Sequence, residues 1–68
     1  MTLQYTYGRI LQLPEVIKRT GIARSSIYAW IEDGRFPRQV SLGARSVGWL
    51  ESEIDAWIQD KINQRAAA

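Results

Sequence analysis

Apolar residues recur with helical spacing early in the chain. Leu13, Val16 and Ile17 follow the i, i+3, i+4 pattern of one helix face. This spacing predicts a helix that begins at Pro14 and ends before Gly21. A proline suits position N1, where its missing N–H is not needed, and a glycine commonly follows the last helical turn.

A second helical stretch follows a tight turn and is predicted over residues 24–33. Ile27 and Ile31 lie four positions apart on its apolar face, and Gly34 ends it. Trp30 lies beside them and suits either the core or a partner surface. The opposite, small and polar face carries Ser25, Tyr28, Ala29 and Glu32. Two short helices joined by such a turn predict a helix-turn-helix.

Strand-like alternation replaces helical spacing after Phe36-Pro37, which cannot continue a helix. Residues 38–42 and 45–49 alternate between polar and apolar side chains around a turn at Gly43-Ala44. This pattern predicts a β-hairpin with Arg45 at its tip. We expect Val40, Leu42, Val47 and Trp49 to face the core, and Gln39, Ser41 and Ser46 to face solvent.

A last helix is predicted to start near Leu50 or Glu51 and to end near residue 65. Its apolar stripe consists of Leu50, Ile54, Trp57, Ile58 and Ile62. Ser52 and Asp55 offer a weak capping box at its start. Acidic residues early and basic residues late suit the helix dipole, so we expect this helix to be structural and to cover the core.

The chain of 68 residues is long enough for one domain only. We assign residues 9–65 to this domain, 1–8 to an N-terminal arm and 66–68 to a frayed tail. Tyr5 and Tyr7 of the arm are expected to pack on the domain. Two helices, a hairpin wing and a third helix predict a mostly α fold class, the winged helix-turn-helix.

Composition excludes several kinds of chemistry. The chain has no Cys and no His, which excludes a disulfide scaffold, a thiolate nucleophile, a Ser-His-Asp triad and a zinc site of His and Cys. We therefore expect no enzymatic activity, no metal and no cofactor. The longest apolar run, residues 27–31, is far shorter than the ~20 residues that span a bilayer. No signal-peptide pattern is visible, so we expect a cytoplasmic protein with no membrane partner.

Basic residues are unevenly distributed along the chain. The formal net charge is +2, but residues 1–47 carry +4 and residues 48–68 carry −2. Seven of the nine basic residues are Arg, whose planar guanidinium suits phosphate and guanine. This distribution favours a nucleic-acid partner over a merely basic surface.

Five short motifs resemble the AlpA family of prophage regulatory proteins, a MerR-like group related to phage excisionases. They are LPEV at 13–16, TGI at 20–22, SSIY at 25–28, GRFP at 34–37 and LGARSVGWLESEIDAWI at 42–58. The resemblance covers residues 9–60 and implies a DNA-binding transcriptional regulator, with excisionase activity as a second role. The family usually has Ser where this chain has Ala23, at the N-cap of the second helix. We expect Ser25 or Ser26 to cap one turn later.

The resemblance implies that the second helix enters the major groove and that the 38–49 wing lies on the minor groove or the backbone. Arg24 suits either a guanine edge or a phosphate. Arg45 at the wing tip suits a narrow minor groove. The remaining candidates would hold phosphates or, in the simpler interpretation, be solvated: Ser25, Ser26, Tyr28, Arg35, Arg38, Lys18 and Arg19.

Double-stranded DNA is thus the expected partner, and the protein would be associated with the nucleoid when bound. One monomer covers little DNA, so we expect cooperative or homodimeric binding. A function of another class stays open. The domain could be a protein-interaction module that presents Trp30, Tyr5, Tyr7 or the last helix to an integrase or an RNA polymerase subunit, with little DNA affinity of its own.

Overall fold

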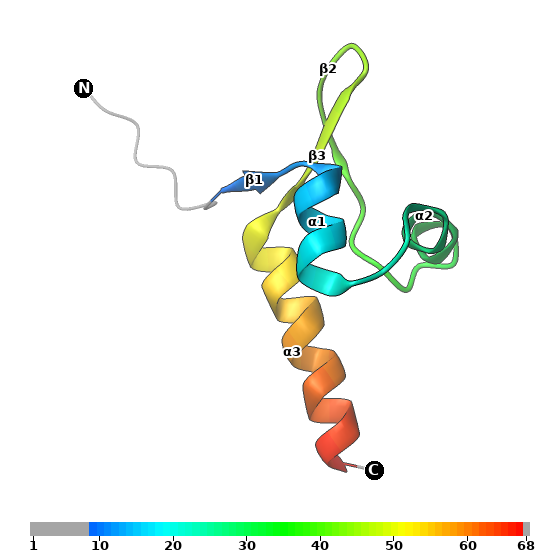
Figure 1. Cartoon of the computed structure of the whole chain (residues 1–68), viewed down its shortest axis with the longest axis vertical. Helices are drawn as coiled ribbons and strands as arrows, with labels where there is room; N and C mark the ends of the chain where they lie inside the picture. Colours follow the sequence, from blue (N-terminus) through cyan, green and yellow to red (C-terminus); the bar gives the residue numbers. More distant parts are fainter. Residues whose placement is uncertain (1–8, 68) are drawn as a thin grey trace, which may run out of the picture.

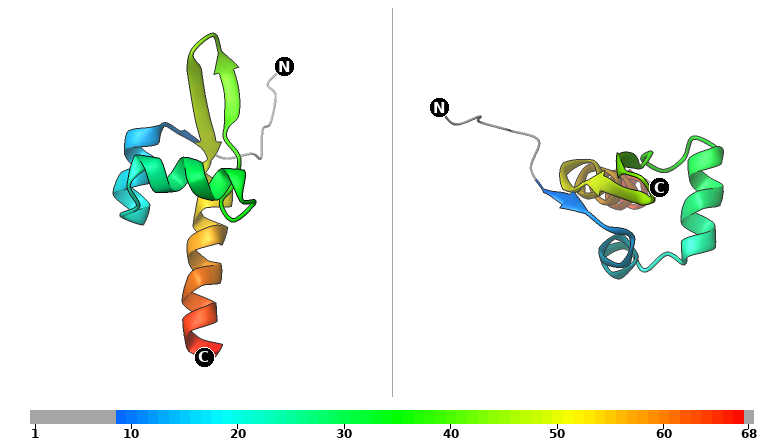
Figure 2. Two further views of the ribbon diagram at one scale, coloured as in Figure 1. Left: turned by 90° about the vertical axis from the view of Figure 1, so that its right-hand side faces the viewer. Right: turned by 90° about the horizontal axis from the view of Figure 1, so that it is seen from above.

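The computed structural model describes residues 9–67, and its wing and α3 point in opposite directions (Figure 1). Its elements are β1 (Ile10–Leu11), α1 (Leu13–Thr20), α2 (Arg24–Glu32), β2 (Val40–Gly43), β3 (Ser46–Leu50) and α3 (Glu51–Ala67). Figure 2 shows α2 lying across the molecule, between the β2–β3 wing and the free end of α3. This arrangement confirms the predicted winged helix-turn-helix. The expected contacts of Tyr5 and Tyr7 fall outside the described residues.

α1 starts one residue earlier than predicted, and α2 ends one residue earlier than predicted. α1 begins at Leu13, so Pro14 occupies its second position, where an N–H is still not needed. Gly21 closes α1 in the left-handed conformation (φ 73°), and its N–H donates to the carbonyl oxygen of Ile17 at 2.7 Å. α2 ends one residue early because Asp33 is its C-cap.

The predicted hairpin forms, but its register is different. The turn lies one residue later than predicted, at Ala44-Arg45, and Val40 pairs with Gly48. An irregularity at Leu42 places an extra residue in β2. A shift of one residue moves each side chain of a strand to the other face of the sheet. The side chains of β2 therefore face the opposite way from the prediction.

The expectation that Val40 and Leu42 face the core is therefore wrong. Their exposed fractions are 37% and 47%, whereas Trp49 is fully buried, as predicted. Val47 is half-buried and packs against the core. Val40 pairs with Gly48, so it lies on the sheet face opposite to Val47 and Trp49.

A third strand, which the sequence pattern does not predict, completes the sheet. β1 pairs antiparallel with β3 through Ile10–Leu50 and Leu11–Trp49, which gives the strand order β1-β3-β2. The N–H of Glu51 extends this pairing by donating to the carbonyl oxygen of Arg9 at 2.8 Å. Two residues are too few to show a period of two, so the pattern carries no signal for this strand.

The core lies where α1, α2, β3 and α3 meet. It consists of Leu11, Val16, Ile27, Ile31, Phe36, Trp49 and Ile54. Ile27, Ile31 and Trp49 are among the residues that the sequence predicts as core. Trp57 and Ile58 are half-buried and pack against this cluster, as does Trp30.

Two Trp side chains hold the segment that joins α2 to β2. The Trp49 Nε1–H donates to the carbonyl oxygen of Pro37 at 3.0 Å, and the Trp57 Nε1–H donates to that of Arg35 at 2.8 Å. Phe36 lies between these residues, and its ring meets that of Trp57 edge-on with centres 4.9 Å apart. The segment is therefore anchored to both β3 and α3.

α3 begins at Glu51, as predicted, and its C-terminal half extends beyond the other elements (Figures 1 and 2). Ile54 is fully buried, but Ile62, two turns later, is 43% exposed. The apolar stripe of this helix thus serves the core only over its first part. The helix continues to Ala67 and so includes two alanines of the predicted tail. Within residues 9–67, no helix combines the length and apolar character that crossing a bilayer requires.

We expect Gly48→Ala to destabilise the fold. A Cβ at this position would collide with Cγ2 of Ile10 and lie 3.1 Å from the carbonyl oxygen of Leu11. Alanine would favour the strand by about 0.5–1 kcal/mol, but overpacking costs about 1–3 kcal/mol. Urea unfolding should therefore show a net loss of about 1–2 kcal/mol.

The double variant Ile10→Ala/Gly48→Ala is the control, because it removes the colliding methyl group. Its loss of stability should be smaller than the sum of the losses of the two single variants. Strictly additive losses, or an unchanged free energy of unfolding for Gly48→Ala, would contradict the packing described here.

Candidate nucleic-acid interface

The first turn of α2 opens the candidate interface. Ala23 is the N-cap in an extended conformation (φ −67°, ψ 153°), and no side chain caps the helix. The expectation that Ser25 or Ser26 caps it is wrong, because both lie inside the first turn. The N–H groups of this turn are left without a side-chain acceptor, and such helix starts attract phosphates.

A row of side chains connects α2 to the wing. The guanidinium carbon of Arg24 lies 5.9 Å from the centre of the Tyr28 ring. The Tyr28 ring meets Trp49 of β3 edge-on, with centres 6.3 Å apart. Arg24 is exposed and Tyr28 half-buried, so the cation–π contact holds the charge at the surface on the side of α2 nearest the wing.

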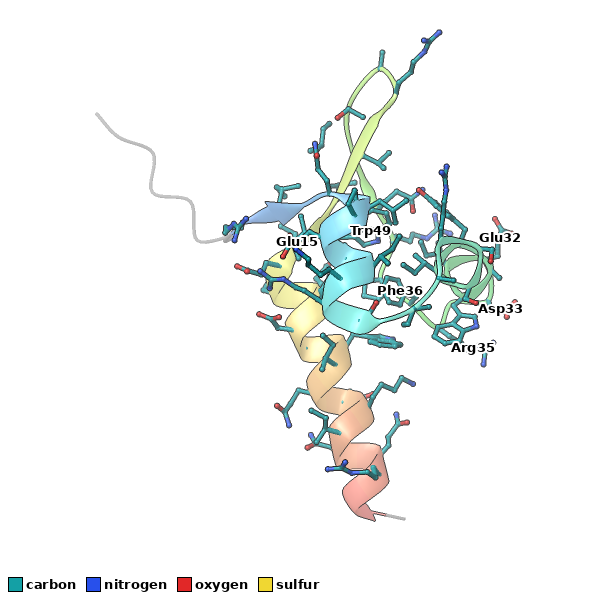
Figure 3. The ribbon with its side chains drawn as sticks, in the orientation of Figure 1. Glu15, Glu32, Asp33, Arg35, Phe36 and Trp49 are labelled. Atoms are coloured by element: carbon teal, nitrogen blue, oxygen red, sulfur yellow. The ribbon has the colours of Figure 1, made fainter. Side chains whose placement is uncertain are left out.

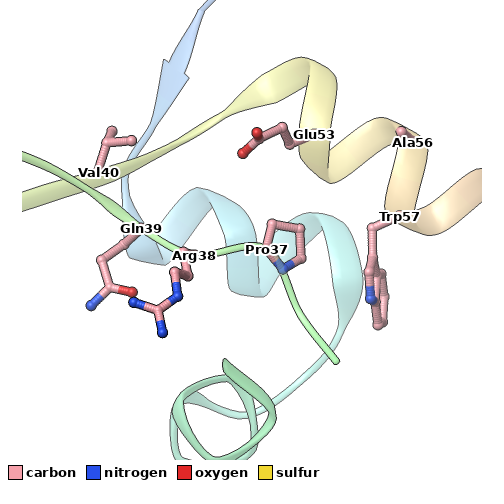
Figure 4. Close-up of a pocket in the computed structure, with 7 residues that line it drawn as sticks. All are labelled: Pro37, Arg38, Gln39, Val40, Glu53, Ala56 and Trp57. Carbon is pink, nitrogen blue, oxygen red and sulfur yellow. The ribbon is translucent and has the colours of Figure 1, made fainter. Parts of the chain in front are cut away.

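An open groove of about 360 Å³ separates α2 from the wing. It is lined by Ile31, Glu32, Arg38, Gln39, Ser41 and Val47. Figure 4 shows Arg38 and Gln39 pointing towards α2. Gln39 and Ser41 are not among the nine candidates, although their alternation along the strand places them on one face. They add hydrogen-bonding groups to a surface that the sequence predicts from its charges.

Arg45 occupies the tip of the wing, at the end farthest from α3. Its φ of 64° is left-handed, and it is the one residue other than Gly with a positive φ in the described part of the chain. A side chain in this region carries a conformational cost that Gly would avoid. A hairpin turn of two residues uses such a conformation, so the turn accounts for it, and the guanidinium is left exposed at the tip of the wing.

Arg35 does not join the groove or the wing tip. Its guanidinium nitrogen lies 3.3 Å from the carboxylate of Asp33, and its guanidinium carbon lies 5.6 Å from the centre of the Trp30 ring. Figure 3 shows Arg35 and Asp33 below α2, on the side away from the wing. This residue is therefore at most at the edge of the candidate interface.

Arg19 ties α1 to α3 instead of facing the groove. Its guanidinium lies 2.9 Å from Glu51, 3.3 Å from Glu15 and 3.6 Å from Asp55. The hydrogen bond to Glu15 is the main cause that raises the pKa of Arg19, against a smaller opposite effect of burial. Figure 3 places Glu15 on the side of α1 away from α2. Lys18, the neighbouring candidate, is exposed on α1.

A second open hollow, of about 530 Å³, lies between the start of β2 and α3 (Figure 4). It is lined by Pro37, Arg38, Gln39, Val40, Glu53, Ala56 and Trp57. The Glu53 carboxylate makes this hollow less favourable for phosphates. Among residues 9–67, no group of three or more His, Cys, Asp or Glu is placed to hold a metal ion.

Comparisons with known proteins find a matching family model and two relatives. A family model described as "Prophage CP4-57 regulatory protein (AlpA)" matches residues 9–62. A protein of Escherichia coli (strain K12) named "DNA-binding transcriptional activator AlpA" is 48% identical over 59 residues, which cover 78% of this chain and 84% of that protein. An uncharacterized protein of Enterobacteria phage P4 is 48% identical over 60 residues, which cover 88% of this chain and 68% of that protein.

We expect Arg19→Gln to affect unfolding rather than nucleic-acid affinity, because its guanidinium bridges two helices. The midpoint of thermal unfolding should fall, and the fall should shrink at about 1 M salt, where the Debye length is about 3 Å. Lys18→Gln is the matched control: it removes the same charge from an exposed neighbour. An Arg19→Gln variant with unchanged stability but weaker DNA binding than Lys18→Gln would reverse this assignment.

Proposed function

The chain belongs to the AlpA family of prophage regulatory proteins, and from this premise we propose that it is a sequence-specific transcriptional regulator that binds double-stranded DNA. The observation that carries the proposal is the placement of its cationic side chains. Arg24 on α2, Arg38 in the groove and Arg45 on the wing tip are exposed on the elements that border one groove. The protein acts by binding and positioning, without catalysis.

In this proposal α2 enters the major groove and the wing lies on the adjacent minor groove or backbone. Ser25 and Ala29 are exposed and small, so they let the α2 backbone approach the base edges. Arg24 can reach a guanine from the start of the helix, a contact that discriminates between bases by about 1–3 kcal/mol. Arg45 suits a narrow, electronegative minor groove.

The remaining contacts position the protein on the phosphate backbone. The free N–H groups of the first turn of α2, the hydroxyls of Ser25 and Ser26 and the Tyr28 hydroxyl form one group of donors. Arg38 with Gln39 forms a second group in the groove. Lys18 and Arg35 lie at the rim, and Arg19 takes no part because three carboxylates surround it.

Regulation and excision of a phage element would use this same DNA surface. The position of the bound sites separates the two roles: sites beside a promoter favour regulation, and sites inside an attachment region favour an excisionase. One monomer covers little DNA, so either role implies copies that bind side by side or as a dimer. Sequencing of genomic fragments retained at two salt concentrations would identify the sites.

The salt dependence of binding tests the proposed contact with the backbone. Neutralising about five phosphates predicts a slope of about −4.5 for the logarithm of the binding constant against the logarithm of salt concentration. Titrations of a labelled duplex over a range of salt concentrations measure this slope. A slope near zero would exclude docking through the cationic surface.

A charge placed at the centre of α2 tests the insertion of this helix. We expect Ala29→Glu to weaken DNA binding at least about tenfold, because a carboxylate facing a duplex costs several kcal/mol. The matched control is Ala56→Glu, the same change at an exposed alanine of α3, which should alter affinity by less than about twofold. Equal losses in both variants would show that only net charge matters and would contradict the proposed orientation.

A further inference from the structure

An apolar groove lies at the end of the molecule opposite the wing tip. It is enclosed by the C-terminal half of α3, the end of α1 and the last turns of α2, with a volume of about 370 Å³. Its lining consists of Arg19, Thr20, Ile22, Trp30, Trp57, Ile58, Lys61, Ile62 and Arg65. We refer to this lining as the α3 groove. Of these residues, only Arg19 is predicted from the sequence to contact DNA.

The apolar floor of the α3 groove is only partly covered by the domain. Ile54 is the residue of α3 that the core buries fully, whereas Ile62 is 43% exposed. Trp30 and Trp57 are half-buried against the core, with ring centres 6.2 Å apart and rings tilted by 33°. The floor therefore offers the uncovered parts of two aromatic rings and an exposed isoleucine to an occupant.

The rim of the α3 groove is basic. The Lys61 ammonium lies 5.3 Å from the centre of the Trp57 ring, so it stands directly beside the floor. Neither Lys61 nor Arg65 takes part in an ion pair between described residues, whereas Arg19 is already neutralised by three carboxylates. No Asp or Glu lines the groove within residues 9–67. An occupant must therefore be apolar at its centre and acidic at its edges.

This chemistry selects among possible occupants. A second copy placed by a two-fold axis would bring Lys61 and Arg65 of both copies together, and like charges at an interface cost several kcal/mol. A DNA duplex could neutralise the rim but would leave Trp57 and Ile62 without an apolar partner. A peptide helix with large apolar residues on one face and acids beside them satisfies both features.

We propose that the α3 groove binds an acidic amphipathic helix of a partner protein. The apolar side chains of this helix rest on Trp30, Trp57 and Ile62, and its acids face Lys61 and Arg65. The C-terminal half of α3, which lines the groove, points away from the wing (Figure 1), so the partner and the DNA can be bound together. The inference goes beyond the proposed DNA binding and does not depend on it.

Two designed helical peptides test this proposal on the full chain. Both carry Leu at i, i+3, i+4 and i+7, and their flanking positions are all Glu in one peptide and all Lys in the other. Trp fluorescence and the anisotropy of labelled peptide report binding. We expect the Glu peptide to bind at least about tenfold more tightly than the Lys peptide, a difference of about 1.4 kcal/mol.

Three variants separate this site from the DNA surface. Lys61→Glu/Arg65→Glu should weaken binding of the Glu peptide at least tenfold and reverse the preference, and Ile62→Ser should weaken both peptides. Lys61→Glu/Arg65→Glu and Ile62→Ser should both keep DNA affinity within about threefold. Arg45→Ala should show the opposite result, with weaker DNA binding and unchanged peptide binding. Circular dichroism establishes that each variant is folded, and the charge variants decide the matter if Ile62→Ser unfolds.

Several outcomes would overturn the proposal. Equal affinity for both peptides, no binding of either, or peptide binding that Lys61→Glu/Arg65→Glu leaves unchanged would each exclude an acidic partner. Self-association that Ile62→Ser abolishes would assign the groove to a second copy of this chain. DNA binding that falls with Lys61→Glu/Arg65→Glu as it falls with Arg45→Ala would assign the rim to phosphates. Failure of the DNA titrations alone would leave the peptide result standing.

Discussion

The hydrogen bonds from two indole groups to the segment 35–37 set the geometry on which the rest of the structure depends. This segment has no secondary structure of its own and lies within the connection between α2 and β2. Trp49 anchors its end at Pro37 to β3, and Trp57 anchors its start at Arg35 to α3. Each bond pairs an indole N–H with a backbone carbonyl oxygen, so losing one removes the direct hydrogen bond that holds that end of the segment. The distance between α2 and the wing, and hence the shape of the groove between them, depends on these two contacts.

A domain of this size gains from giving one side chain two tasks. It buries only a modest share of its surface and has no disulfide to hold it together. Trp49 is fully buried in the core and also donates a hydrogen bond to Pro37. Trp57 packs on Phe36 and donates a hydrogen bond to Arg35. Trp side chains suit this double role because they combine a large apolar area with one strong donor. Core packing and the geometry of the interface are therefore coupled, so a change that loosens the core also displaces the segment that joins α2 to the wing.

The sequence predicts best where a single element determines the outcome. Helical periodicity locates both ends of α1 and α2 and the start of α3 within one residue, and Gly21 closes α1 in the left-handed conformation. Register depends on a partner strand, which is why the facing of Val40 and Leu42 is mispredicted and β1 is missed. In the candidate site, too, the sequence predicts what one element determines and misses what the contact between elements determines. Arg24 and Arg45 lie where the helix and the hairpin tip place them, whereas the pairing of Arg19 with two acids of α3 arises only when distant elements meet.

That pairing also explains how a chain with nearly balanced charge obtains two basic surfaces. Glu51 and Asp55 lie against Arg19 on α1, so the acids that begin α3 are compensated within the fold. The uncompensated cations are then left at opposite ends, around α2 and the wing and beside Trp57 on α3. The first surface offers hydroxyls and amides that phosphates and bases can use. The second offers an apolar floor that they cannot. Since Trp57 is bonded to the segment that also positions the wing, a protein held in the α3 groove would keep a fixed orientation relative to the DNA.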